Sequence, residues 1–219
     1  MTSIASACPG PDIAPDRWRH IELLVDGSDS MSAIRTQTEV GVRAFLAEQR
    51  KVPGRTTVSL TMFAHEVEMI FANHELAQVP EIRLAPRGQT ALLDAIGQTL
   101  TQARRFVRGR PRPERPDEII VVVVTDGYDN ASRRFTSDEV RALIHHLHGK
   151  KRNWQVVLVG ATVGVEALAE SLGVPVSAAI RYDHALSETA LTVAGQMLRR
   201  ASETGRLGFT EDERAATRH

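Results

Sequence analysis

The sequence predicts an α/β domain with a mostly parallel sheet covered by helices on both faces. The first observation is the unbroken β-branched run at 119–124, which is typical of a central parallel strand buried on both faces. The second is the alternation of strand-like and helix-like patterns along the chain, the signature of this fold class. The third is a pair of alternating apolar segments at 57–63 and 65–71, which a very short link joins into an antiparallel hairpin.

Apolar spacing and capping residues place the elements in order along the chain. Thr36 with Glu39, and Thr136 with Glu139, fit capping boxes at the starts of two helices. The pattern predicts strand 21–25, helix 35–49, strands 57–63 and 65–71, a helix opening at 88–90, strand 119–124, a helix from 136, strand 156–159, helix 165–172, a weaker strand at 176–182 and helix 186–198.

Length and composition bound the organisation of the protein. The 219 residues fit one domain, which we expect at 19–202 between a flexible N-terminal arm (1–18) and a flexible C-terminal tail (203–219). Equal numbers of acidic and basic residues, 27 each, argue against a general nucleic-acid binder. One cysteine, no signal-peptide pattern and no membrane-spanning run predict a cytoplasmic protein without a membrane partner. The excess of arginine over lysine suggests a GC-rich, bacterial source.

Oxygen-bearing side chains gather where strands end. Asp26 and Asp126 each follow a strong strand, and sites in open α/β sheets form at the carboxyl ends of strands. Ser28 and Ser30 share a tight turn with Asp26, and Thr90 opens a helix. Carboxylates and hydroxyls are hard ligands suited to Mg²⁺, Mn²⁺ or Ca²⁺.

These motifs resemble the metal-ion-dependent adhesion site of von Willebrand factor type A domains, and the resemblance spans about residues 20 to 200. It rests on Asp26-x-Ser28-x-Ser30, on Thr90 after Gly88-Gln89, and on Thr125-Asp126-Gly127. The segments 125–132 and 159–161 also resemble those of stand-alone bacterial members of the family. The resemblance implies a doubly wound, Rossmann-like sheet of six strands with one antiparallel edge strand. It also implies that Ser28, Ser30 and Thr90 contact the metal and that Asp26 and Asp126 bind it directly or through water.

Two departures and several simpler interpretations accompany this hypothesis. Asp29 and Gln89 stand where the family usually has glycine, and Asp29 could strengthen cation binding, bind a second ion or point to solvent. Ser30 and Thr90 alone would fit helix N-caps. We interpret Asp129 as a loop hydrogen-bonder.

Two further clusters in the sequence suggest sites of other kinds. His145, His146 and His148 resemble a metal cluster, but helix geometry favours a surface or capping role. The arginine- and proline-rich stretch 108–115 fits a solvated loop, with an acidic partner or nucleic acid as the minor alternative.

The resemblance implies a binding module whose metal accepts an Asp or Glu side chain from a partner protein. Two other functions remain open. One is an Mg²⁺-dependent phosphohydrolase of the aspartate-nucleophile type, which needs a second Asp where this chain has Ser28. The other is a scaffold subunit with a vestigial metal site. The sequence identifies no catalytic residues, and it specifies neither the partner, the cellular process nor the oligomeric state.

Overall fold

The computed structural model describes residues 17–148, 153–161 and 164–218. In this part of the chain one sheet has the strand order β3-β2-β1-β4-β5-β6. All neighbouring strands run parallel except the edge pair β2 and β3. The strands are β1 (Trp18–Asp26), β2 (Arg55–Phe63), β3 (Val67–Glu75), β4 (Glu118–Thr125), β5 (Asn153–Gly160) and β6 (Ala179–Arg181). The predicted fold class, including the antiparallel edge strand, is confirmed.

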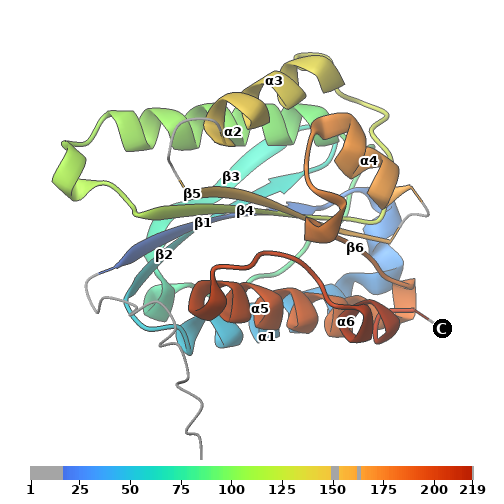
Figure 1. Ribbon diagram of the computed structural model, residues 1–219. Coiled ribbons are helices and arrows are strands. Elements are labelled where there is room, and N and C mark those ends of the chain that lie inside the picture. Colours follow the sequence, from blue (N-terminus) through green and yellow to red (C-terminus); the bar gives the residue numbers. More distant parts are fainter. Residues whose placement is uncertain (1–16, 149–152, 162–163, 219) are drawn as a thin grey trace, which may run out of the picture.

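Helices cover both faces of this sheet, as Figure 1 shows. They are α1 (Arg35–Arg50), α2 (Leu92–Arg108), α3 (Ser137–His148), α4 (Val165–Leu172), α5 (Ser187–Thr204) and α6 (Glu211–Ala215). Helices α2, α3 and α4 lie on one face, and α1 and α5 lie on the other (Figure 1). None of the helices in the described residues is long and apolar enough to cross a membrane.

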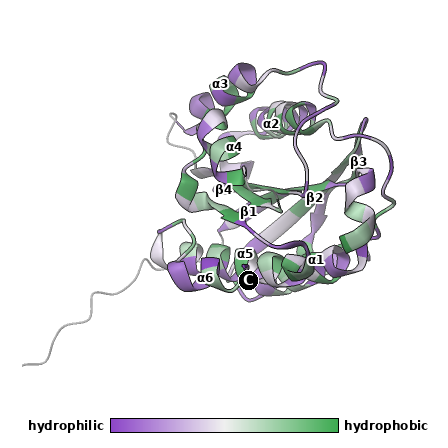
Figure 2. Cartoon of the chain, turned by 90° about the vertical axis from the view of Figure 1, so that its right-hand side faces the viewer, coloured by the Kyte–Doolittle hydropathy of each residue, from purple (hydrophilic) through white to green (hydrophobic). Residues whose placement is uncertain are grey.

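The core has two apolar layers, one on each side of the sheet. Every residue of β4 is buried, as the β-branched run predicts, because helices pack on both of its faces. Coloured by hydropathy, the strands form an apolar band between the two helical layers (Figure 2). Strand β1 lies beside β4, with Leu23 opposite Val122. The chain turns to opposite sides of the sheet after these two strands, which creates a crevice at their carboxyl ends.

Helices α1 and α5 approach each other closely because glycines stand at their contact. A Cβ atom on Gly41 would lie 2.8 Å from Leu191 Cδ1. At Gly195, the backbone oxygen accepts a hydrogen bond from the side-chain amide of Gln49 at 3.0 Å. Because these glycines have no side chain, the two helices can contact each other directly.

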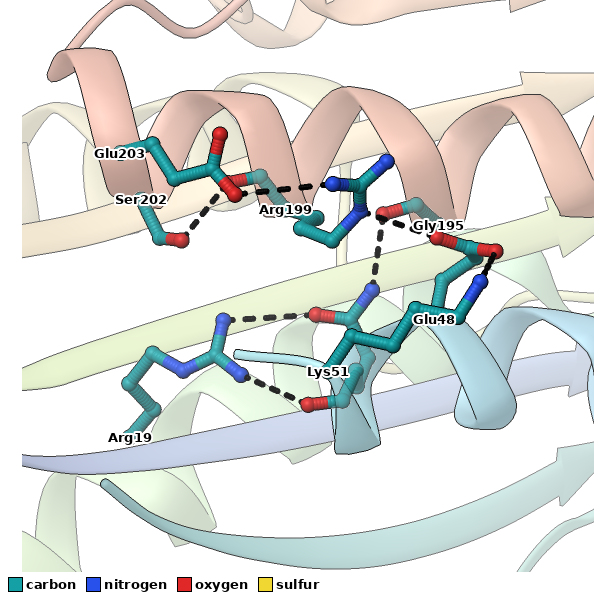
Figure 3. A network of polar contacts seen from close by, with 8 residues as sticks. Arg19, Glu48, Lys51, Gly195, Arg199, Ser202 and Glu203 are labelled. Carbon is teal, nitrogen blue, oxygen red and sulfur yellow. Dashed lines mark hydrogen bonds and ion pairs between the residues drawn. The ribbon is translucent and has the colours of Figure 1, made fainter. Parts of the chain in front are cut away.

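A polar network ties the same helix pair to the start of β1 (Figure 3). The buried Arg19 donates to Gln49 Oε1 at 3.3 Å. Burial lowers the pKa of Arg19 to about 10. Glu48 of α1 accepts hydrogen bonds from Lys51 and from Arg199 of α5. These contacts hold α1, α5 and the sheet together on the side away from α2.

Three local predictions differ from the structure. Helix α1 has Ile34 at its N-cap and no side-chain cap, so the Thr36–Glu39 capping box is wrong; Glu39 instead accepts a hydrogen bond from the backbone N–H of Leu84 at 2.8 Å. The weak strand at 176–182 shortens to β6, preceded by a 3-10 turn at Val176–Ala178.

The third difference concerns residues 203–218, which we expected to form a flexible tail. The structure places α6 there, begun by a capping box between Thr210 and Glu213. Phe209 and Thr217 are buried, and the Thr217 hydroxyl donates to the Arg181 carbonyl at 2.7 Å. The segment therefore packs against the β6 edge of the sheet. Of the arm expected at 1–18, residues 1–16 lie outside the described residues, whereas Trp18 is the first residue of β1.

Candidate metal centre

The predicted site residues meet in the crevice at the carboxyl ends of β1 and β4. Asp26 is the last residue of β1, and Asp126 directly follows β4. The two strands are hydrogen-bonded neighbours, so the two carboxylates lie at one edge of the sheet. The register and the strand order place this pair at the point where ligand sites form in open α/β sheets.

Asp26 is fully buried and organises the turn that follows it. Its Oδ1 accepts a hydrogen bond from the backbone N–H of Ser28 at 2.8 Å, and its Oδ2 accepts one from the Thr125 hydroxyl at 2.6 Å. Burial raises the pKa of Asp26, the hydrogen bonds from Thr125 and Ser28 oppose that rise, and the nearby charge of Asp126 adds to it. The site thus holds a carboxylate that a positive charge would stabilise.

The two serine hydroxyls connect the turn to the second carboxylate. Ser28 Oγ and Ser30 Oγ lie 3.0 Å apart, and Ser30 Oγ donates to Asp126 Oδ1 at 2.7 Å. The Ser30 hydroxyl can reach Asp126 because Asp29–Ile34 forms a 3-10 helix. At its start the Met31 N–H donates to the Ser28 carbonyl at 3.0 Å. The structure therefore joins four of the five predicted residues in one hydrogen-bonded group. Asp29 is exposed at the start of this 3-10 helix.

Thr90, the fifth residue, lies beside the Asp126 turn. A Cβ atom on Gly127 would be 3.4 Å from Thr90 Oγ1, so the two turns are in direct contact. The Thr90 backbone is bound on both sides: its N–H donates to Asn130 Oδ1 at 2.8 Å, and its carbonyl accepts from the N–H groups of Asn130 and Ala131. Thr90 is buried and held in place by these bonds.

The loop at 127–135 has its own supporting carboxylates. Asp129 accepts hydrogen bonds from the Leu93 N–H at 3.1 Å and from the Ser132 hydroxyl, which agrees with its predicted role in the loop. Asp94 in the first turn of α2 accepts from the N–H groups of Arg133, Arg134 and Phe135. Sequence reasoning missed Asp94, although an acid in a first helical turn is a recognisable signal.

The donor set fits a hard divalent cation. Asp126 Oδ2 is buried without a hydrogen bond, and His184 Nε2 lies 3.9 Å from it. The Tyr182 hydroxyl is also buried without a hydrogen bond, and its pKa is raised by burial and by the charges of Asp126 and Asp26. Two carboxylates and three hydroxyls match the oxygen ligands of Mg²⁺, Mn²⁺ or Ca²⁺.

No alternative centre made of His, Cys, Asp or Glu is present in the described residues, where no three such side chains are arranged to hold a metal ion. His145, His146 and His148 lie in the last turn of α3. Burial and the neighbouring His145 lower the pKa of His148, which favours its neutral form.

No family model matches the sequence, and no curated protein matches it. Solved structures do match. Proximal thread matrix protein 1 from the mussel byssus is 15% identical, with a TM-score of 0.61 over 84% of this chain and 47% of that one. A second structure of the mussel protein, described as having a zinc-occupied MIDAS motif, gives 18% identity and a TM-score of 0.56 over 84% and 47% of the two chains.

The manganese-loaded TRAP protein of Plasmodium vivax is 12% identical, with a TM-score of 0.57 over 82% of this chain and 73% of that one. A protein from Catenulispora acidiphila described as von Willebrand factor type A gives 15% identity and a TM-score of 0.54, over 86% and 43%. At such identities the likeness establishes the fold alone, which is that of a von Willebrand factor type A domain. The chain spans about half the length of the mussel protein.

Proposed function

We propose that the chain is a metal-dependent protein-binding module in which Asp26, Ser28, Ser30, Thr90 and Asp126 hold one divalent cation. The observation that carries the proposal is one hydrogen-bonded group of Asp26, Ser28, Ser30 and Asp126 in which the second Asp126 oxygen is buried and accepts no hydrogen bond. The metal-loaded mussel and Plasmodium proteins, which share the fold, support it.

The ligand chemistry favours an acidic partner. Three of the five side chains are neutral hydroxyls, so a bound ion would keep much of its positive charge. Helix α2 begins at Leu92, two residues after Thr90, and the partial positive charge of a helix N-terminus favours anions nearby. An Asp or Glu side chain of a partner protein fits this surface, and we propose that it completes the coordination of the ion.

An enzymatic role is the weaker proposal. An aspartate-nucleophile phosphohydrolase needs a general acid two residues after Asp26, and Ser28, whose hydroxyl bonds to Ser30, stands there. A vestigial site is also disfavoured, because all five side chains are present in one cluster. We further propose a cytoplasmic location and Mg²⁺ as the ion, which rest on the sequence.

Calorimetric titration with Mg²⁺, Mn²⁺ and Ca²⁺ tests the metal site. We expect one site of modest affinity in the wild type, no binding in Asp26→Ala, and unchanged binding in Asp138→Asn, which removes an exposed acid from the start of α3. Undiminished binding by Asp26→Ala in a folded protein would exclude these ligands.

Affinity capture from the native host tests the partner. The immobilised wild type should retain a protein in Mg²⁺ and release it with chelator, and Asp126→Asn should not retain it. Substitution of single acids on the captured protein should then identify one Asp or Glu on which binding depends. Capture that is indifferent to chelator, or to every acid on the partner, would contradict the proposed mechanism.

A further inference from the structure

A second cavity lies at the opposite end of the sheet from the metal site. It has a volume of about 680 Å³ and is lined in part by Trp18, Thr57, Phe106, Arg110, Arg112 and Arg115. Trp18 begins β1 and Asp26 ends it, so the two sites are separated by about 27 Å of extended strand. In Figure 1 the loop after α2, which forms one wall, is at the left, at the amino ends of β1 and β4.

The wall contributed by α2 and the following loop carries a net positive charge. Residues 104–117 contain six arginines and two acids, a net charge of +4 in a chain whose net charge is zero. Of these, Arg110, Arg112 and Arg115 line the cavity together with both acids, Glu114 and Asp117. Within the described residues none of the six arginines makes an ion pair, whereas Arg55 on the opposite wall pairs with Glu75 at 2.6 Å. The unpaired positive charge is therefore concentrated on one side of the cavity.

Two of these arginines have a structural role that leaves donors free. Arg110 donates to the Phe106 carbonyl at 3.2 Å and stacks 3.7 Å above the Phe106 ring centre. Arg115 donates to the carbonyls of Arg108, the last residue of α2, and of Arg110. A guanidinium has five N–H donors, so these bonds fix the position of both groups and leave further donors available. Arg112 is exposed and makes no side-chain hydrogen bond in the described residues.

The remaining walls of the cavity are also fixed. Arg55 lies 4.4 Å from the centre of the Trp18 ring. The indole N–H of Trp18 donates to the buried Thr57 hydroxyl at 2.9 Å, and that hydroxyl lies 2.8 Å from His20 Nδ1. Cations already cover the Trp18 and Phe106 rings, so a ligand entering here meets N–H groups rather than bare aromatic faces.

We propose that this cavity binds a small ligand that carries two or more phosphates. Three guanidinium groups with unused donors, those of Arg110, Arg112 and Arg115, lie on one side of it, and one carboxylate, with two oxygens, saturates a single arginine fork. A phosphate offers three oxygens and more charge, so it can bridge two or three arginines. The volume lies in the range of small-molecule sites. The proposal does not depend on the metal site.

The test is calorimetric titration of the full chain with inorganic triphosphate in the presence of EDTA, which keeps metal out of the measurement. We expect saturable binding with one ligand per chain. Arg110→Gln combined with Arg112→Gln should weaken it about tenfold, because each variant removes charged hydrogen-bond donors. The matched control, Arg141→Gln with Arg206→Gln, removes equal charge from exposed sites elsewhere and should bind like the wild type.

Arg110 packs on Phe106, so its variant must be shown to fold by an unchanged melting temperature. Arg112→Gln alone, at an exposed residue, should still weaken binding about threefold. Absence of saturable binding, or equal weakening in the control pair, would overturn the proposal. Equal competition by citrate would refute the preference for phosphate. Much tighter binding of a short oligonucleotide, with the same dependence on Arg112, would overturn the small-ligand proposal and indicate that the cavity binds a nucleic-acid backbone.

Discussion

Asp126→Asn separates the stability of the fold from the stability that a metal adds. The Asp126 side chain is fully buried, with one oxygen bonded to Ser30 and the other unbonded. Asparagine keeps the size of the side chain and an oxygen for the Ser30 hydroxyl, but it removes the negative charge beside Asp26. The metal-free variant should therefore be as stable as the wild type or slightly more stable, because a like-charge repulsion disappears.

The effect of metal should differ sharply between the two proteins. A ligand that binds only the native state stabilises it by about 2.7 kcal/mol at a hundredfold excess over its Kd. In a domain of this size each kcal/mol raises the melting temperature by about 2–4 °C, so saturating Mg²⁺ should raise that of the wild type by about 5–10 °C. The variant should show little of this increase, since it lacks one charged ligand.

Differential scanning calorimetry of both proteins, with EDTA and with Mg²⁺, measures the four melting temperatures. Asp26→Ala is a poorer choice for this purpose because Asp26 also holds the Ser28 N–H and the Thr125 hydroxyl. If Asp126→Asn were destabilised in EDTA and still gained the full increase in Mg²⁺, then Asp126 would be a structural residue and not a ligand.

Three other predictions concern stability. Gly41→Val should destabilise the fold by about 1–3 kcal/mol in urea denaturation, because Leu191 leaves no room for a side chain, and a neutral effect would contradict that packing. The hydrogen bond from Lys51 lowers the pKa of Glu48; its stabilisation is present above the unfolded pKa and is lost as the pH falls through the folded value. The stability difference between wild type and Glu48→Gln should thus be largest near pH 7 and shrink below about pH 4, whereas a difference that does not vary with pH would count against the ion pairing. Phe209→Ala should cost about 3 kcal/mol of unfolding free energy, and an unchanged value would mean that the C-terminal segment adds nothing to stability.

The sheet was predictable from sequence because its strands carry local signals. The run that became β4 is apolar at consecutive positions, which only burial on both faces tolerates. The site residues could be placed for a related reason: Asp26 and Asp126 directly follow such strands, and parallel neighbours end at one edge. Burial, the Ser30–Asp126 bond and the position of Thr90 required the structure.

The errors arose where distant contacts decide the local structure. The spacing of Glu39 to Thr36 predicts a helix cap, but the Glu39 carboxylate accepts a hydrogen bond from the N–H of Leu84, which is 45 residues away in sequence. The segment after Ser202 has a polar sequence, and its packing depends on a few buried residues such as Phe209. Sequence periodicity carries no information about either contact.

The two ends of β1 have opposite electrostatic character, and the polarity of the helices contributes to both. The antiparallel β3 ends beside the start of β2, and residues 76–91 bring the chain back to the carboxyl ends of the parallel strands, so α2 begins close to Asp126 and ends at the arginine-rich cavity. Arginines at its C-terminus offset the negative end of the helix dipole, while its N-terminus favours an anionic partner at the metal. Strand β1 is buried and paired on both sides along its length, so it offers no second arrangement through which one site could alter the other. Triphosphate affinity should consequently be the same in Asp126→Asn as in the wild type, and a change of more than about threefold would reveal coupling between the sites.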